Sequence, residues 1–417
     1  MITQLYTLWA LFFGIALITI GNGLQGTILG VRGTMEGFSV GTLGFIMSSY
    51  YLGFLLGSFY VQKLILKVGH IRVFAAFASV ASISILGHSL IFDPLSWGLF
   101  RLISGFSFAG IFVVAESWLN DQSQNEDRGK ILSIYMAINH GGFLIGQLFL
   151  NLAHPGGFTH FILISILLSF ALIPILVTAS PFPSFNSYQP MSVSELYHNS
   201  PTALVGGICV GVAHGCVWGL GPVYAFKSGF DVYGVSIFMG VFLLGGFIFQ
   251  WPIGMLSDKF DRRSVLFRVV WSAAIFALAC SFFSETNSDL LLFLMFVFGG
   301  LSLPLYSLCI AHANDKLDRS QMVSGSSTMV LMYGCGALFG PLLGSLSMEL
   351  FGRIGFFYQL TFVHIILGIF VFARIKKSAP VPLVEQEEFI PVPSTTSPMV
   401  SNLAPNATDE SPESTNE

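Results

Sequence analysis

The chain has 417 residues, of which 53% are hydrophobic and 10% are charged, and it contains 42 Phe and 44 Gly. This composition, with a mean hydropathy of +0.75, excludes a water-soluble domain of this length. The formal net charge of −4 gives no sign of a nucleic-acid partner, because acidic residues concentrate in the last part of the chain. We therefore expect a polytopic membrane protein.

Apolar runs divide most of the chain into membrane-spanning segments. A helix that crosses a bilayer needs about 20 mostly apolar residues, and the sequence contains twelve such runs. They cover residues 8–30, 42–65, 73–92, 97–118, 131–153, 159–179, 203–226, 234–256, 265–284, 289–312, 323–348 and 355–374. The even number predicts that both termini lie on the same side of the membrane. The first run has no basic segment before it and is too long for a signal peptide, so we expect it to remain as a helix.

The distribution of Lys and Arg predicts which side the termini face, because these residues accumulate in cytoplasmic loops. With the N-terminus inside, fourteen of the 18 Lys and Arg residues fall on the cytoplasmic side. The exceptions are Arg32, Arg101, Lys227 and Arg353. The sequence therefore predicts a multi-pass membrane protein with both termini in the cytoplasm.

Two segments of low hydrophobicity set the predicted domain boundaries. We expect an N-terminal six-helix bundle over residues 1–180, a cytoplasmic linker over 181–202 and a C-terminal six-helix bundle over 203–375. Residues 376–417 are rich in Pro, Ser, Thr and acids, which predicts a disordered cytoplasmic tail that is dispensable for the function of the membrane region.

The five cysteines all lie within predicted spans and show no metal-ligand or CxxC spacing. They are Cys209, Cys216, Cys280, Cys309 and Cys335. We interpret them as buried small apolar residues, and we expect no metal site and no cofactor.

The two halves of the membrane region repeat each other at an offset of about 192 to 194 residues, as transporters built from repeats do. GGFLIGQ at 141–147 falls on CGALFGP at 335–341. At the same offset the charged stretch GMLSDKFDRR, at 254–263, falls on QKLILKVGHIR, at 62–72. The charged stretch therefore occupies one of two equivalent loops, each following the second span of its half.

This loop resembles the signature between the second and third helices of the major facilitator superfamily. The matching residues are Gly254, Asp258, Lys259, Arg262 and Arg263, with Asp261 where that family prefers glycine. The first-half copy departs further, since Gln62 replaces the glycine and Leu66 replaces the acid.

Other strings agree with the same family. Arg101, Gly105 and Ala109 resemble its fourth-helix signature, an arginine followed by small residues at helical spacing. FQWPIG at 249–254, VVAESW at 113–118 and the pair Gly146-Gln147 are similar to one bacterial branch, the YcaD-like permeases. The resemblance implies an all-α membrane protein with twelve transmembrane helices in two pseudo-symmetric six-helix bundles.

The resemblance also implies that the first, fourth, seventh and tenth helices line a central cavity. We predict that substrate contacts Asn22, Gln25, His214, Trp218, Tyr224 and Tyr306. Candidates for proton coupling are Arg101, His140 and His214, because ionisable residues inside a membrane are functional candidates by default.

Each of these candidates has a structural alternative. Arg101 lies about one turn inside the outer end of its span, where its side chain could instead snorkel to the interface or pack between helices. A lone histidine such as His214 or His140 can be a hydrogen-bonded structural residue. Asn22 and Gln25 share one helix face, which suits substrate contact or interhelical hydrogen bonding equally well.

For the charged loops we weigh two interpretations, topology anchors or a cytoplasmic gate. In the gate hypothesis, Asp258 faces a helix N-terminus or a base such as Arg128 in the opposite half when the cytoplasmic side closes. Glu116 is too far along its helix to pair with Arg101, so we expect it to join Arg72 or Arg128. The predicted gate residues are Gly254, Asp258, Lys259, Arg262, Arg263, Glu116, Arg72 and Arg128.

The function that follows is secondary active transport of a small organic solute by alternating access, coupled to protons and in an undecided direction. No P-loop, nucleophile motif or metal cluster points to an enzyme or to ATP-driven transport. We expect a monomer in the lipid bilayer whose ligands are a small-molecule substrate and protons. The alternative is a membrane sensor or scaffold on a transporter fold that carries out no net transport.

Overall fold

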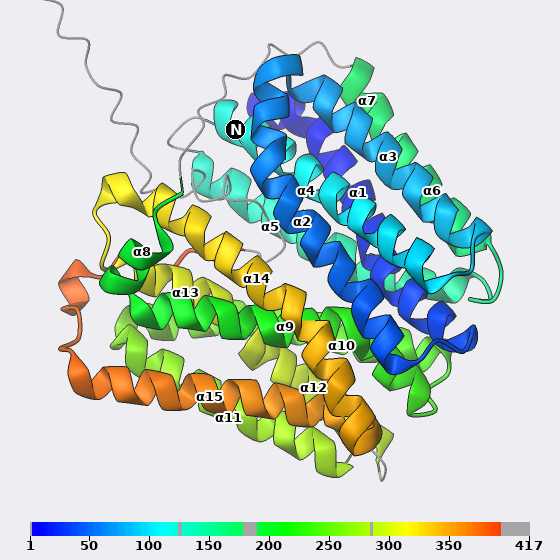
Figure 1. Ribbon diagram of the computed structural model, residues 1–417. Helices are drawn as coiled ribbons and strands as arrows, with labels where there is room; N and C mark the ends of the chain where they lie inside the picture. Colours follow the sequence, from blue (N-terminus) through cyan, green and yellow to red (C-terminus); the bar gives the residue numbers. More distant parts are fainter. Residues whose placement is uncertain (1, 124–126, 178–189, 284–286, 393–417) are drawn as a thin grey trace, which may run out of the picture.

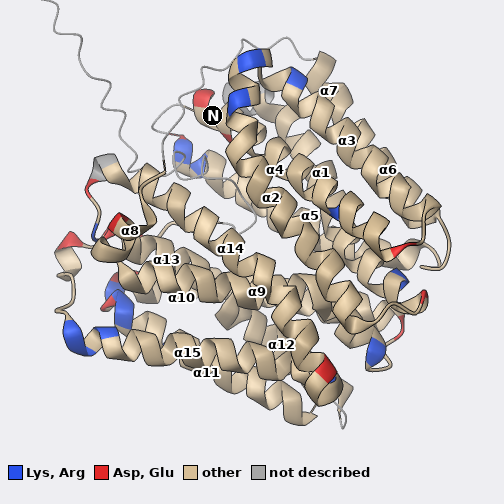
Figure 2. Cartoon of the chain, viewed as in Figure 1, with Lys and Arg blue, Asp and Glu red and all other residues tan. Residues whose placement is uncertain are grey.

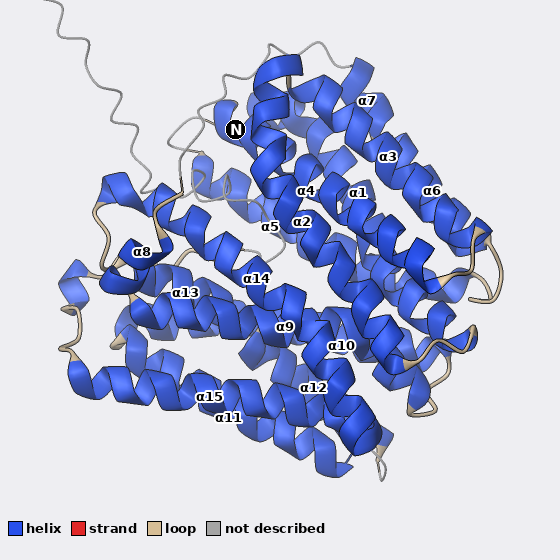
Figure 3. Ribbon diagram, viewed as in Figure 1, coloured by secondary structure: helices blue, strands red, loops and turns tan. Residues whose placement is uncertain are grey.

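The computed structural model describes residues 2–123, 127–177, 190–283 and 287–392. Throughout these residues the chain forms helices and connecting loops, without strands (Figure 3). Two helical bundles lie side by side at an angle, one built from the first half of the chain and one from the second (Figure 1). The predicted all-α fold is confirmed.

The first bundle contains α1 (Ile2–Met35), α2 (Val40–Val68), α3 (His70–Leu90), α4 (Pro94–Asp121), α5 (Arg128–Phe149), η1 (Leu150–Leu152), α6 (Thr159–Phe170) and α7 (Leu172–Val177). The second contains α9 (Pro201–Lys227), α10 (Val232–Lys259), α11 (Arg262–Phe283), α12 (Ser288–Ser302), α13 (Leu305–Asn314), α14 (Arg319–Phe351), η2 (Gly352–Ile354) and α15 (Gly355–Lys377). Outside the bundles lie α8 (Val193–Asn199) and η3 (Leu383–Glu385).

In the described part of the chain, eleven helical segments are long and apolar enough to cross a membrane. The last of them, Gln321–Lys377, contains both α14 and α15, which reverse direction at Gly352. Gly352 has a φ of 68°, a left-handed conformation that glycine adopts without steric cost. This segment therefore accounts for two of the twelve predicted spans.

Two predicted spans are interrupted rather than continuous. The tenth is divided into α12 and α13 just before Pro304, since proline lacks the N–H that would bond to the preceding turn. The sixth is divided into α6 and α7 at Ala171, three residues before Pro174. The same loss of a backbone donor explains this second break.

Close helix packing repeats between the bundles at the offset predicted from the sequence. Gly146 of α5 lies against the Ile20 carbonyl of α1, and Gly340 of α14 lies against the Val212 carbonyl of α9. The two glycines are 194 residues apart and the two carbonyls are 192 residues apart. Small residues let helix backbones approach closely in membranes, so the repeat is present in packing as well as in sequence.

A side chain at Gly146 is therefore expected to destabilise the first bundle. An added Cβ at this position would lie 2.9 Å from the Leu24 backbone nitrogen, and backbone cannot move aside as a flexible side chain can. We expect Gly146→Ala to cost about 1–3 kcal/mol and to lower the Tm of the purified protein. Gly141→Ala, on the same helix with nothing near the added carbon, is the control, and an equal loss in both variants would contradict this account.

The bundles touch over one part of their length only. Among the described residues, α2 packs on α14, α1 on α9 and α5 on α10. Gly44, near the start of α2, lies against Ser345 of α14, and Asn151 donates to Ser236 Oγ at 2.8 Å. From these contacts the two bundles diverge toward the other end of the molecule (Figure 1).

The end at which the bundles diverge carries much of the positive charge. Here α2, α10 and α15 end with Lys67, Lys259 and Lys377 in their last turns, and we call it the basic end. Figure 2 shows Lys and Arg gathered at the ends of the helices, with few in their middle portions. Charged residues at both ends and apolar residues between them fit a protein that crosses a bilayer.

The predicted linker and the predicted tail contain more ordered structure than their composition suggests. The predicted linker 181–202 contains the short helix α8, capped by Ser192, whose hydroxyl accepts from the Glu195 amide at 3.1 Å. Disorder was expected from residue 376 onward, but α15 continues through Lys377 and residues 378–392 lie against the second bundle. Hydrogen bonds to the backbone of this segment hold it there, a kind of contact that composition does not reveal. Residues 393–417 lie outside the described residues.

Candidate functional site

Arg101 is a buried cation inside the first bundle. It lies on α4, only 5% of its surface is exposed, and its guanidinium stands 4.3 Å from the centre of the Tyr50 ring on α2. The Nε and Nη1 atoms find no hydrogen-bond partner among the described residues. The side chain therefore does not snorkel to the surface, and its donors remain available to a ligand.

Polar groups of α1 and α2 extend this site. Asn22 donates to the Tyr50 hydroxyl at 3.4 Å, which connects it to the ring beneath Arg101. Gln25 is fully buried, and neither its amide nitrogen nor its oxygen has a hydrogen-bond partner in the part of the chain that the structure describes. Unsatisfied buried amides are rare in folded proteins, so Gln25 is suited to bind a solute.

An aromatic path continues from this site into the second bundle. The ring of Tyr51 packs edge-on against Tyr50 at 5.5 Å, and its side chain lies near Tyr333 of α14. Tyr333 in turn packs 4.8 Å from Tyr306 of α13, whose hydroxyl has no partner among the described residues. The predicted substrate residue Tyr306 thus belongs to the same chain of contacts as Arg101.

His214 occupies a different kind of position. Its two ring nitrogens lie 3.2 Å from the Tyr333 hydroxyl and 3.1 Å from the Ser302 carbonyl oxygen, and the side chain is fully buried within the second bundle. Both nitrogens are therefore already engaged. This geometry favours the structural alternative, in which His214 holds α9 to α12 and orients Tyr333.

The two remaining substrate candidates, Trp218 and Tyr224, lie in different surroundings. Trp218 of α9 lies between Phe143 and Phe242, and its indole N–H has no partner among the described residues. Tyr224 is fully buried and stacks on Phe356 of α15 at 4.9 Å. Trp218 therefore faces the boundary between the bundles, whereas Tyr224 is part of the core of the second bundle.

His140 borders a cavity of about 540 Å³ that lies between α5 and α10 on the side of the basic end. Its Nδ1 atom is 2.9 Å from the Met136 carbonyl, and its ring lies 6.1 Å from Phe247. The backbone contact occupies one nitrogen and leaves the other for exchange with the cavity. Of the three proton-coupling candidates, His140 is the histidine with such access.

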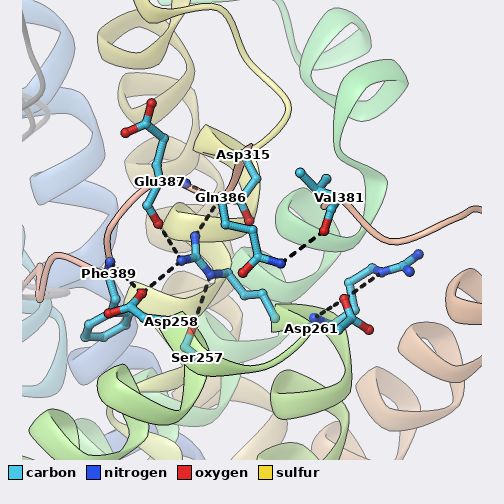
Figure 4. A network of polar contacts seen from close by, with 10 residues as sticks. Ser257, Asp258, Asp261, Asp315, Val381, Gln386, Glu387 and Phe389 are labelled. Atoms are coloured by element: carbon cyan, nitrogen blue, oxygen red, sulfur yellow. Dashed lines mark hydrogen bonds and ion pairs between the residues drawn. The ribbon is translucent and has the colours of Figure 1, made fainter. Parts of the chain in front are cut away.

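Three of the predicted gate residues, Asp258, Arg262 and Arg263, take part in a dense polar network at the basic end (Figure 4). Arg262, with 1% of its side chain exposed, donates to Asp315 at 2.7 Å and to Asp258 at 3.2 Å. It also donates to Ser257 Oγ at 2.9 Å and to the Glu387 carbonyl at 2.6 Å. Burial raises the pKa of Asp315 to about 6, although the Arg262 charge and the Glu387 amide act in the opposite direction.

The other members of this loop are arranged around Arg262. Arg263 contacts Asp261 at 3.4 Å and donates to the Ser378 carbonyl at 2.8 Å. Lys259 is exposed at the end of α10, and Gly254 lies against the ring of Phe389. Asp258 contacts its own bundle and the tail, so the predicted latch to the opposite bundle is not formed in this conformation.

The gate candidates of the first bundle differ in how deeply they are buried. Glu116 is fully buried and accepts a 2.6 Å hydrogen bond from the Tyr135 hydroxyl of α5. Arg128 begins α5 and is buried, whereas Arg72 is exposed on α3. The bond from Tyr135 is a contact that sequence reasoning did not consider, and the pairing of Glu116 with Arg72 or Arg128 stays a prediction.

Several residues that belong to the Arg101 site or to the network around Arg262 were not predicted from the sequence. They are Tyr50, Tyr333, Ser307, Asp315 and the segment around Phe389. Asp315 had a detectable signal, because it is an acid directly after the tenth span, on the predicted side of the charged loop. Phe389 had none, since its contact with Asp258 is made through a backbone amide.

Among the described residues, no group of three or more His, Cys, Asp or Glu side chains could hold a metal ion. What the arrangement offers instead is one buried cation, several unsatisfied polar groups and aromatic walls. Such a set can bind an organic solute that carries a negative charge or strong hydrogen-bond acceptors.

Comparison with known proteins agrees with this architecture. The sequence profile of the Major Facilitator Superfamily matches residues 11–238 and 203–406. An uncharacterized MFS-type transporter of Enterobacter sp. (strain 638) is 26% identical over 341 residues, covering 81% of this chain and 88% of that protein. The uncharacterized MFS-type transporter YcaD of Escherichia fergusonii is also 26% identical, with the same coverage of 81% and 88%. The predicted resemblance to this branch is confirmed.

Solved structures show the same fold at low sequence identity. The nucleoside transporter NupG superposes with a TM-score of 0.74 at 15% identity, covering 90% of this chain and 100% of that one. A bacterial homolog of the human lysosomal transporter Spinster gives a TM-score of 0.70 at 14% identity, covering 93% and 97%. The profile spans both bundles and its members are transporters rather than enzymes, so the chain is a multi-pass membrane protein that belongs to the Major Facilitator Superfamily.

Proposed function

We propose that this protein is a secondary active transporter that moves small organic anions across a bacterial inner membrane by alternating access, with protons as the coupling ion. The basic end faces the cytoplasm, as the distribution of Lys and Arg predicts. The observation that supports an anionic solute is the buried guanidinium of Arg101, which has two nitrogens unpartnered among the described residues.

A buried charge without a partner is costly, which is why Arg101 points to a ligand. An arginine remains protonated in proteins, and a charged side chain buried inside a membrane protein is costly unless it is paired. The ring of Tyr50 offsets part of this cost through a cation–π contact. A carboxylate or phosphate on the solute would complete the pairing with bidentate hydrogen bonds.

The remainder of the solute is expected to be partly apolar. The rings of Tyr50, Tyr51, Tyr333 and Tyr306 connect the two bundles, while Trp218 lies at their boundary. Aromatic walls with a few polar groups are typical of sites for small organic molecules. Because both bundles contribute, a solute bound here would be released when the bundles move apart.

His140 is the residue that we expect to carry the coupled proton. Its ring borders the cavity at the basic end, and histidine changes charge near physiological pH. Replacing it with Gln is expected to abolish the acceleration of transport by a pH gradient while leaving downhill exchange within about twofold of the unchanged protein. Parallel uptake assays with and without the gradient measure this, and a His140→Gln variant that still responds fully to the gradient would exclude this role.

The transport function is tested by comparing the metabolites inside and outside cells that contain or lack the gene, at two external pH values. We expect one or a few organic acids to change their distribution, by a factor that depends on external pH. If no solute is redistributed, a sensor or scaffold without net transport becomes the better explanation of this fold.

A further inference from the structure

Residues 386–392, with the sequence QEEFIPV, run along the second bundle at the basic end, and we call them the tail segment. Their backbone amides are held by side chains of three separate helix ends. The Glu387 amide donates to Asp315 at 3.1 Å, the Phe389 amide to Asp258 at 2.9 Å, and the Val392 amide to Ser307 Oγ at 3.0 Å. These bonds fix the path of the tail segment over α10 and α13.

Two backbone carbonyls of the same segment are also bound. Arg262 donates to the Glu387 carbonyl at 2.6 Å, and the Ser307 hydroxyl donates to the Val392 carbonyl at 3.1 Å. Ser307 is itself held by Gln250 Nε2 at 3.1 Å. Main-chain hydrogen bonds of this kind give a peptide its affinity, while pockets for individual side chains give the specificity.

Two apolar side chains provide those specific contacts. The ring of Phe389 covers Gly254, where an added Cβ would lie 2.7 Å from Phe389 Cε1. Val392 is buried, with 8% of its surface exposed. Gly254 of the family signature therefore has a local task in this protein, which is to leave room for Phe389.

The tail segment lies where the bundles would have to meet. The cavity beside it is bordered by Met136 and His140 of α5, by α10 and by Phe389 and Pro391 of the tail segment. Toward the opposite end α5 and α10 already contact each other, as Leu144 does with Gly240. Rocking of the bundles that closes the basic end would bring the remaining parts of α5 and α10 together, into the space beside Phe389.

We propose that the tail segment is an autoinhibitory strap that keeps the basic end open. When the strap is docked, it fills space between α5 and α10. Its Phe389 amide donates to the carboxylate of Asp258, the residue of the predicted latch. Closure then requires that the strap leave its site, so the same residues cannot serve the strap and the closed gate together. Transport does not require the tail, but its rate is limited by release of the strap.

Closure of the basic end is the motion assumed by the proposed transport function, and it can be followed by a distance rather than by flux. Spin labels at the exposed positions Arg72 and Lys376, introduced as cysteines in a background with the five native cysteines replaced by alanine, report the separation of the bundles in lipid nanodiscs. The chains compared are the full chain, one ending at residue 385, one ending at residue 392, and the full chain with Phe389→Ala.

In the chain ending at 385 and in Phe389→Ala we expect the ratio of the short-distance to the long-distance population to rise about tenfold. The chain ending at 392 keeps the strap and should match the full chain. A synthetic peptide QEEFIPV added to the chain ending at 385 should restore the long distance. Since Phe389→Ala retains every residue that contacts Arg262, a shift in this variant is not a folding defect of the truncated chain.

Two results would overturn the strap. Identical distance distributions in the chains ending at 385 and 392 and in the full chain would show that the tail segment does not affect the opening. Equal shifts in both truncated chains would assign the effect to residues beyond 392 instead. The readout does not depend on the solute, so either result leaves the transport proposal standing on its own test.

Discussion

Replacing Arg101 with Gln is expected to lower kcat/KM for transport of an organic anion about 100-fold. Hydrogen bonds to a charged group contribute about 1.5–3 kcal/mol each, and a bidentate pair with a carboxylate contains two of them. The guanidinium lies buried over Tyr50, and two of its nitrogens have no partner among the described residues. Water has little access to this site, so it cannot fully replace the lost hydrogen bonds to the solute. The loss should appear mainly in the affinity for the solute.

Two variants distinguish ligand binding from a general effect of charge. Arg101→Lys keeps the charge but not the bidentate geometry, so it should retain more activity than Arg101→Gln while remaining well below the unchanged protein. Lys227→Gln removes an exposed cation at the end of α9 and should transport normally. If Arg101→Gln transports the anion with unchanged affinity, Arg101 does not bind the solute.

Replacing Arg262 with Met is expected to give the largest loss of stability. Arg262 pairs with Asp315 at 2.7 Å, and each side chain is 1% exposed. Breaking a buried ion pair leaves an uncompensated charge and costs about 3–5 kcal/mol. The free energy of unfolding can be measured by denaturant titration of the purified protein. Lys259→Met, which removes an exposed cation from the same loop, should change it little.

The pH dependence of this loss follows from the pKa of Asp315. Burial already raises the pKa of Asp315 to about 6 and Arg262 opposes this rise, so removal of Arg262 moves the pKa higher. The unfolded carboxyl ionises near pH 4, and the folded variant therefore binds a proton that the unfolded chain has lost. Its stability falls as pH rises, and the deficit relative to the unchanged protein should be larger at pH 8 than at pH 5.

The double variant Arg262→Met with Asp315→Asn provides the control. It removes both charges, so it should recover part of the stability and lose the added pH dependence. If Arg262→Met is no less stable at pH 8 than at pH 5, the buried carboxylate of Asp315 is not the cause of the loss.

The bundles were predictable because their signals are local. The length of an apolar run sets a membrane span, and the repeat of Gly146 at Gly340 can be read from the sequence before its packing partner is known. The breaks before Pro304 and Pro174 could also have been placed from the missing backbone donors.

The sites were predictable only in part, because they depend on which helices meet. Sequence identified Arg101 but not the ring of Tyr50 beneath it, and it did not distinguish the engaged nitrogens of His214 from the open access of His140. The docked tail segment was missed altogether. Its contacts are made mainly by backbone groups, which leave no pattern of side chains to recognise.

Flux in reconstituted vesicles tests the central claim most directly. Purified protein in liposomes is given a mixture of small organic anions outside, with and without an imposed pH gradient, beside vesicles that contain Arg101→Gln. We predict accumulation of at least one anion that the gradient accelerates and that the variant loses. The account would be contradicted if no anion entered faster than in protein-free vesicles, or if the variant accumulated it equally well.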